Sequence, residues 1–140
     1  MTEQYVCNPI GKVSSPFKEK GDAPSQGREK NLISRIIIDP VYAGGLEGLT
    51  AGQQIFVLCW FDRSARDVIK VHPRGKMENP LTGVFNTRSP ERPNPVSLTL
   101  VTIQEISDNV LTVSGLDALD NTPVIDIKPY SGKIDESIHA

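Results

Sequence analysis

Turn residues interrupt this chain too often for long helices to form. Runs rich in β-branched and aromatic residues alternate with turn signals such as Gly44-Gly45, Asn79-Pro80 and Ser107-Asp108-Asn109. Such a pattern is typical of short antiparallel strands, whereas a parallel α/β sheet needs crossover helices that this sequence does not supply. We predict eight strands, over residues 5–13, 32–38, 54–61, 68–72, 83–86, 96–106, 111–114 and 124–128.

Strands of this length and spacing predict an all-β fold: a single antiparallel β-barrel of about eight short strands with long functional loops. Residues 111–114 and 124–128 alternate apolar and polar side chains, as strands with one buried face do. Residues 55–61 are apolar throughout, which predicts a central strand covered on both sides. The polar segment 18–30 should be a functional or disordered loop, and residues 46–49 a short helical turn.

Length and composition fit one compact domain over residues 1–140, of which 38% are apolar. No run approaches the roughly 20 apolar residues of a membrane span, and the N-terminus lacks the layout of a secretion signal, so we expect no membrane association and a cytoplasmic location. Cys7 and Cys59 are isolated from each other and from histidines. They should therefore be packing residues rather than a disulfide or a metal site.

Charge is distributed unevenly along the chain. The net charge of −2 argues against a protein that mainly binds nucleic acid. Basic residues nevertheless outnumber acidic ones over residues 63–92, and the reverse holds over 105–140. RNA could therefore be contacted by the basic middle only. The sequence contains neither of the common glycine-rich nucleotide-binding motifs. Its only histidines, His72 and His139, lie far apart in the sequence, which argues against a histidine-based catalytic or metal site.

A proline-rich loop carries two arginines at the end of a predicted strand. Pro90, Pro93 and Pro95 restrict the backbone around Arg88 and Arg92, so part of the ordering entropy of a binding loop is removed in advance. Guanidinium groups bind carboxylates and phosphates through a rigid fork of donors. The loop is either a preorganised polar ligand site or a strand connection whose charges are solvated.

An acidic turn follows, in the sequence Gly115-Leu116-Asp117-Ala118-Leu119-Asp120-Asn121-Thr122-Pro123. Two carboxylates three residues apart between strands could bind ribose hydroxyls or the positive charges of a ligand. Alternatively, Asp117 and Asp120 form an Asx-type turn by accepting hydrogen bonds from backbone N–H groups.

Three blocks of the sequence resemble one family. The run Gly83-Val84-Phe85-Asn86-Thr87-Arg88-Ser89-Pro90-Glu91-Arg92-Pro93-Asn94-Pro95, the acidic turn continued to Tyr130, and the weaker N-terminal block 10–18 with Pro24-Ser25-Gln26 are similar to the TrmO family, also called TsaA or YaeB-like. Members of that family are S-adenosylmethionine-dependent tRNA methyltransferases. The resemblance covers residues 9–135.

The resemblance implies methyl transfer to N6 of threonylcarbamoyladenosine beside the anticodon of tRNA, by a homodimer with the cofactor near the subunit boundary. A non-catalytic nucleotide- or RNA-binding barrel, or a methyltransferase with another substrate, remains an alternative. Asp117 or Asp120 would assist proton removal. The implied cofactor contacts are Pro24, Ser25, Gln26, Asp62, Arg63, Arg88, Leu98, Asp117, Ala118, Leu119 and Asp120, and the implied substrate or anion contacts are Arg92, Asn94, Lys128 and Tyr130.

The sequence also departs from the family pattern. The family often has a histidine near Asp62-Arg63, and glycine at the positions of Ser97 and Asn121. Asparagine tolerates positive φ, so the acidic turn can form with Asn121. The decisive geometric expectation is that Arg88 and Asp117 line one cavity.

Overall fold

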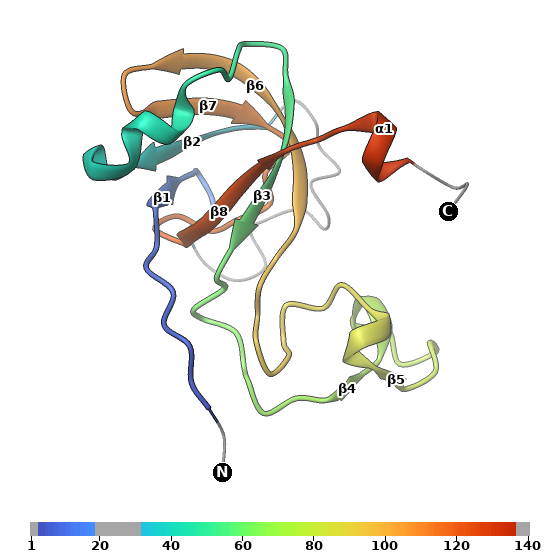
Figure 1. Cartoon of the computed structure of the whole chain (residues 1–140). Coiled ribbons are helices and arrows are strands. Elements are labelled where there is room, and N and C mark those ends of the chain that lie inside the picture. Colours follow the sequence, from blue (N-terminus) through green and yellow to red (C-terminus); the bar gives the residue numbers. More distant parts are fainter. Residues whose placement is uncertain (1–2, 19–31, 137–140) are drawn as a thin grey trace.

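Six strands close into an antiparallel barrel in the computed structural model, which describes residues 3–18 and 32–136 (Figure 1). Around the barrel their order is β1-β2-β7-β6-β3-β8. The strands are β1 (Gly11–Ser14), β2 (Ile33–Ile38), β3 (Gln54–Cys59), β6 (Thr99–Ser107), β7 (Val110–Ser114) and β8 (Pro123–Pro129). The all-β antiparallel barrel predicted from the sequence is confirmed.

The barrel interior is filled by one face of each strand, because successive side chains of a strand point to opposite sides. The buried core comprises Val13, Ile36, Ile38, Ile55, Val57, Cys59, Val101, Ile103, Leu111, Val113, Leu116, Ala118 and Val124. Phe56 and Leu58 on β3, and Trp60 directly after it, are only half-buried. The prediction of a strand covered on both sides was therefore wrong, since a closed barrel encloses one face only.

The first strand begins later than predicted. Residues 3–9 are exposed and belong to no strand, and pairing starts at Gly11, which lies opposite Ile38 on β2 and Val124 on β8. A Cβ atom on Gly11 would lie 2.3 Å from the carbonyl oxygen of Ile37. The backbones of β1 and β2 thus approach at a distance that only glycine permits.

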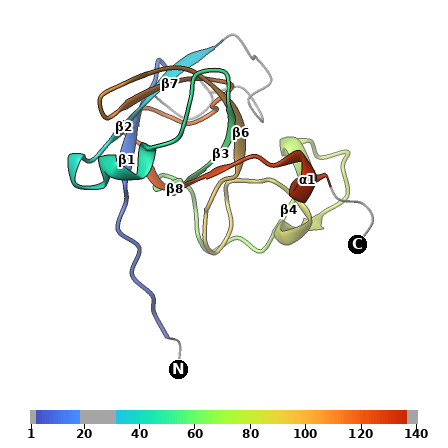
Figure 2. The same cartoon turned by 45° about the horizontal axis from the view of Figure 1, so that its top comes forward.

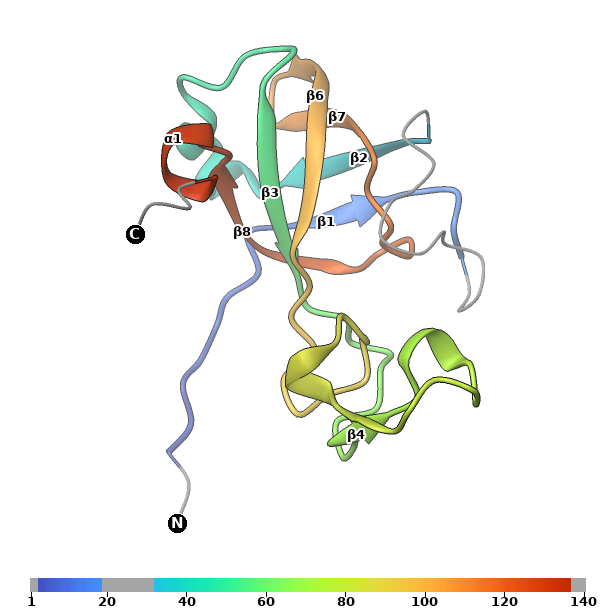
Figure 3. The ribbon, with the colours of Figure 1, turned by 90° about the vertical axis from the view of Figure 1, so that its right-hand side faces the viewer.

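Two predicted strands lie outside the barrel. β4 (Lys70–Val71) and β5 (Thr82–Gly83) pair only with each other among the described strands, and each is followed by a 3₁₀ helix, η3 (Pro73–Gly75) after β4 and η4 (Val84–Asn86) after β5. Figures 2 and 3 show this segment, residues 70–86, standing apart from the barrel, and we call it the lobe. The expected eight-stranded barrel thus has six strands, because the lobe places a single residue, Val84, in a buried position.

The remaining described helices are short. η2 (Pro40–Leu46) begins after Asp39, whose side chain accepts a hydrogen bond from the N–H of Val41, so the helical turn expected at 46–49 occurs earlier. α1 (Gly132–Asp135) begins after Ser131, whose hydroxyl caps the N–H of Ile134. No helix among the described residues is long and apolar enough to cross a membrane.

Candidate functional site

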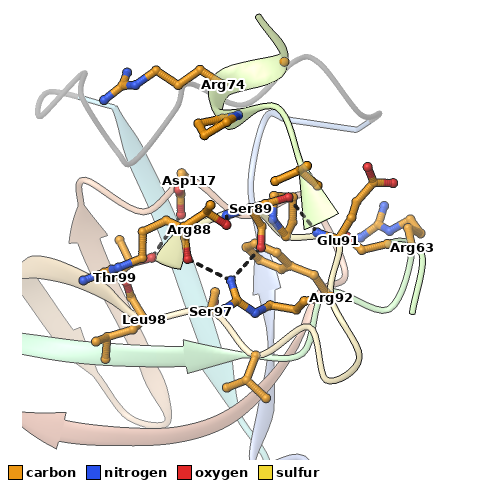
Figure 4. A pocket seen from close by; sticks show the side chains of 18 of the residues that line it. Arg63, Arg74, Arg88, Ser89, Glu91, Arg92, Ser97, Leu98, Thr99 and Asp117 are labelled. Atoms are coloured by element: carbon orange, nitrogen blue, oxygen red, sulfur yellow. Dashed lines mark hydrogen bonds between the residues drawn. The ribbon is translucent and has the colours of Figure 1, made fainter. Parts of the chain in front are cut away.

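A cavity of about 1150 Å³ lies where the end of β3 and the start of β6 meet the lobe (Figure 4). Four segments distant in sequence supply its walls: the residues after β3, the lobe, the proline-rich loop and the acidic turn. The predicted site residues that line it are Asp62, Arg63, Arg88, Arg92, Leu98, Asp117 and Leu119. The expectation that Arg88 and Asp117 share one cavity is confirmed.

Arg92 organises the proline-rich loop from within. Its guanidinium donates hydrogen bonds to the carbonyl oxygens of Thr87 (3.1 Å), Ser89 (2.9 Å) and Val84 (2.9 Å). The N–H of Arg92 also donates to the carbonyl of Ala65 at 3.1 Å. This arginine therefore stabilises the loop itself, while the anion-binding role implied by the resemblance stays a prediction.

Arg88 and Asp117 are each tied to the beginning of β6. The Nη1 of Arg88 donates to the carbonyl oxygen of Leu98 at 3.3 Å, and the hydroxyl of Thr99 donates to Asp117 Oδ1 at 3.0 Å (Figure 4). A cationic and an anionic group are thus bonded to two adjacent residues, Leu98 and Thr99, at the point where β6 begins. That arrangement suits a ligand that carries charges of both signs.

Asp120 is bonded to residues of the N-terminal segment rather than placed in the cavity. Its carboxylate accepts hydrogen bonds from Lys18 Nζ and from the N–H of Ser15, both at 2.9 Å, and it does not line the cavity. The hydrogen bond from Lys18, followed by that from Ser15, holds the pKa of Asp120 below its usual value. A carboxylate with a lowered pKa is a weaker proton acceptor, which argues against Asp120 as a general base.

Arg63 joins the end of β3 to the acidic turn. Its Nη2 donates to the carbonyl oxygen of Asp120 (2.7 Å) and to the hydroxyl of Thr122 (3.0 Å), and its Nε lies 3.5 Å from Asp62 Oδ1. The turn itself has Asn121 in the left-handed region at φ 66°, as expected where the family has glycine. Arg63 thereby fixes one wall of the cavity.

Several predicted site residues do not line the cavity. Lys128 pairs with Asp126 at 3.1 Å, and Tyr130 donates to Glu136, a hydrogen bond that raises the pKa of the phenol. Lys128 lies opposite Phe56 near the start of β3, whereas the cavity lies beyond the end of that strand. The substrate- or anion-binding role that the family resemblance implied for these two residues stays a prediction.

Ala118 is fully buried in the core, and Asn94 accepts a hydrogen bond from Arg66 Nη2 at 3.1 Å. Neither lines the cavity. Pro24, Ser25 and Gln26, like the rest of residues 19–31, lie outside the described residues.

Two residues beside the cavity were not expected to take part in its construction. The hydroxyl of Ser97 accepts a hydrogen bond from the N–H of Cys59 at 3.1 Å, and Thr99 holds Asp117. Burial raises the pKa of Cys59 to about 12, helped by the charge of Asp117 and opposed by the Ser97 hydrogen bond. Cys59 is thus an inert packing residue, as expected, whereas Cys7 is exposed, contrary to expectation. Only the position of Thr99 directly after the loop signals its role.

The lobe contributes a wall that the sequence did not assign. His72, Arg74 and Phe85 line the cavity from the lobe side. Figure 4 shows Arg74 on a segment separate from Asp117 and Arg88. In residues 3–18 and 32–136, no three His, Cys, Asp or Glu side chains cluster as metal ligands would.

Comparison with known proteins covers almost the whole described chain. A family model described as "tRNA-methyltransferase O N-terminal domain" matches residues 12–136. An "S-adenosyl-L-methionine-binding protein" of Archaeoglobus fulgidus is 50% identical over 130 residues, which are 93% of this chain and 92% of that protein. A "Probable S-adenosyl-L-methionine-binding protein" of Methanothermobacter thermautotrophicus is 51% identical over 127 residues, covering 91% and 90%.

A solved structure shares the fold. The crystal structure of TrmO from Pseudomonas aeruginosa superimposes with a TM-score of 0.79 at 29% identity, over 99% of this chain. This chain spans 61% of the length of that structure. The similarity therefore covers the barrel and its lobe.

Proposed function

This chain belongs to the tRNA-methyltransferase O family, and we propose that it transfers a methyl group from S-adenosylmethionine to N6 of threonylcarbamoyladenosine beside the anticodon of tRNA. The observation that carries the proposal is the cavity in which Arg88 and Asp117 flank the start of β6. Both residues belong to the sequence blocks that resemble the family, and they come from different segments of the chain.

The cavity residues suit a zwitterionic cofactor. The guanidinium of Arg88 would bind its carboxylate, and Asp117 would attract its ammonium or sulfonium charge. Leu98 and Leu119, which also line the cavity, offer apolar surface to the adenine. Arg63 holds the acidic turn in place through Asp120 and Thr122, and it also lines the cavity, where it could contact the cofactor.

The protein's main task in the reaction is alignment. Bound S-adenosylmethionine would supply an electrophilic methyl group for transfer to N6, with S-adenosylhomocysteine as the leaving product. The cavity residues hold the nucleophile in line with the methyl group. We assign acceptance of the N6 proton to Asp117, because Asp117 lines the cavity and Asp120 does not.

Mass spectrometry of tRNA nucleosides tests the reaction. We expect incubation of the protein with S-adenosylmethionine and tRNA carrying threonylcarbamoyladenosine to add one methyl group to that nucleoside. A methyl group on another nucleoside or on a small molecule would favour the alternative substrate. Calorimetry that detects no cofactor binding would favour a non-catalytic RNA-binding barrel.

We also propose that the protein works as a homodimer in the cytoplasm. Ile69, Met77, Leu81 and Leu100 are large apolar side chains with 40–76% of their surface exposed. A second copy would cover such surface and place its own residues near the cavity. Sedimentation showing only monomer at micromolar concentration, with activity intact, would contradict the dimer.

A further inference from the structure

The proposed function gives a role to only one of the cavity's two walls. All of its residues that are proposed to hold the cofactor come from the barrel side, namely the residues after β3, the proline-rich loop and the acidic turn. The lobe side, with His72, Arg74 and Phe85, has no role in that proposal. At about 1150 Å³ the cavity also exceeds the roughly 300–1000 Å³ usual for one small ligand. There is therefore room for a second group against the lobe.

The Phe85 side chain is exposed to solvent, and hydrogen bonds hold the backbone next to it in place. Its side chain is 85% exposed, although the preceding Val84 is 1% exposed. The N–H of Val84 donates to the carbonyl of Ile69 at 3.0 Å, and the carbonyl of Val84 accepts from Thr87 and Arg92. The backbone at this position is thus fixed on both sides. An aromatic ring held out in this way beside a cavity is a surface for another flat group.

Arg74 is held at the same wall in an unfavourable backbone conformation. Its φ of 61° and ψ of 18° lie in the left-handed region, which residues other than glycine rarely adopt. Two hydrogen bonds brace the turn: His72 Nδ1 with the carbonyl of Asn79 at 2.8 Å, and Asn79 Nδ2 to the carbonyl of Pro73 at 2.7 Å. Because a carbonyl only accepts, His72 Nδ1 carries the proton. Strain that the surroundings maintain is typical of binding sites.

We propose that the lobe wall is the subsite for the acceptor nucleotide, with Phe85 stacking on an unpaired RNA base and Arg74 pairing with an adjacent phosphate. The inference rests on the proposed function, since it assigns the substrate's place in the same cavity. Proteins that bind single-stranded RNA combine aromatic stacking surfaces with cations in this manner. A base stacked on the lobe would face the methyl donor held by the barrel wall.

Substitution of Phe85 tests the stacking. With a fluorescent anticodon stem–loop RNA and saturating S-adenosylhomocysteine, we expect Phe85→Ala to raise the Kd for RNA by roughly 5- to 150-fold, the range for loss of one stacked base. The KM for RNA should rise likewise, with the Kd for S-adenosylmethionine unchanged. Phe85→Trp should restore RNA binding, and Phe85→Leu should not, because an aliphatic side chain has no π-face.

Tyr5→Ala is the matched control, because Tyr5 is also 85% exposed but does not line the cavity. It should bind RNA as wild type does. RNA binding by Phe85→Ala equal to wild type would overturn the subsite. So would a Phe85→Ala protein that becomes monomeric or loses cofactor affinity, because the ring would then belong to a subunit contact or to the cofactor. A wild-type protein that binds no S-adenosylmethionine would instead overturn the proposed function.

Arg74 provides an independent readout. Arg74→Ala should weaken RNA binding and reduce the slope of log Kd against log salt concentration by about 1, as expected for one lost phosphate contact. Arg74→Lys should preserve the slope. An Arg74→Ala protein with the wild-type salt dependence would show that this residue contacts no phosphate.

Discussion

At the scale of single residues, the two aspartates of the acidic turn have different hydrogen-bond partners. Asp117 lines the cavity with Thr99 as a hydrogen-bond donor, whereas Asp120 binds Ser15 and Lys18 on the other side of the turn. Sequence spacing treats the two as equivalent. Their contacts predict different consequences when each is altered.

Replacement of Thr99 by valine should impair the site with little change in shape. The hydroxyl donates to Asp117 Oδ1, and a hydrogen bond to a charged group contributes about 1.5–3 kcal/mol. We expect Thr99→Val to lower S-adenosylmethionine affinity by about tenfold in calorimetry, and Thr99→Ser to retain it. Equal affinity in all three proteins would show that Asp117 needs no such positioning.

Acid should remove the contribution of Asp120 to stability. The pKa of this carboxyl is lowered in the folded protein, so its stabilising effect is present above its unfolded value of about 4 and is lost as pH falls through the folded value. Asp120→Asn should therefore be less stable than wild type to urea at pH 7. That difference should shrink below pH 4. A difference that persists unchanged at pH 2 would contradict the linkage to Lys18.

Among the structural elements, the proline-rich loop depends on a guanidinium fork as well as on its prolines. The prolines restrict single backbone dihedrals, but Arg92 joins Val84, Thr87 and Ser89, which no local restriction brings together. Arg88, which lies inside this set, reaches Leu98 from a backbone that Arg92 holds. The two arginines therefore have separable effects.

Arg92→Lys should lower both stability and cofactor affinity, because one ammonium group cannot reproduce three bonds from a planar fork. We expect about 1–3 kcal/mol lower free energy of unfolding by denaturant titration. Arg88→Ala is the comparison: it should lose cofactor affinity at nearly wild-type stability. If Arg92→Lys kept both properties, the loop would be held by its prolines alone.

At the level of the whole molecule, the barrel is closed by a short stretch of pairing between β1 and β8. β1 pairs with β8 through only Gly11↔Val124 and Lys12↔Pro123, and the same glycine packs against the backbone of β2. The acidic turn, which lines the cavity, runs directly into β8. The pairing of β1 with β8 therefore also holds one wall of the cavity in place. A defect at Gly11 should therefore affect the whole fold.

Gly11→Ala should destabilise the protein by about 3 kcal/mol or more, because the added methyl group would meet backbone that cannot move aside. Thermal unfolding followed by circular dichroism measures the effect. Gly44→Ala is the control, since a Cβ there would have nothing within 4 Å. A Gly11→Ala protein as stable as this control would contradict the close approach of β1 and β2.

The sequence predicted the strands better than their assembly. Six of the expected runs overlap barrel strands, because alternation and turn residues are local properties. Residues 68–72 and 83–86 were also predicted as strands, but the strands that they overlap, β4 and β5, belong to the lobe. Whether a strand joins the barrel depends on which other strands it pairs with and which side chains it buries. A local sequence pattern contains no information about either.

Local chemistry, then, is what this sequence determines by itself: strands, turns, the stiffened arginine loop, and the family to which its motifs belong. The tertiary structure alone decided which polar groups meet. It moved Lys128 and Tyr130 away from the cavity, turned Asp120 toward Lys18, and brought Arg74 and Phe85 of the lobe opposite the barrel wall. The physical reason is that side-chain direction and strand order depend on long-range pairing, whereas strand and turn formation depends mainly on neighbours in sequence.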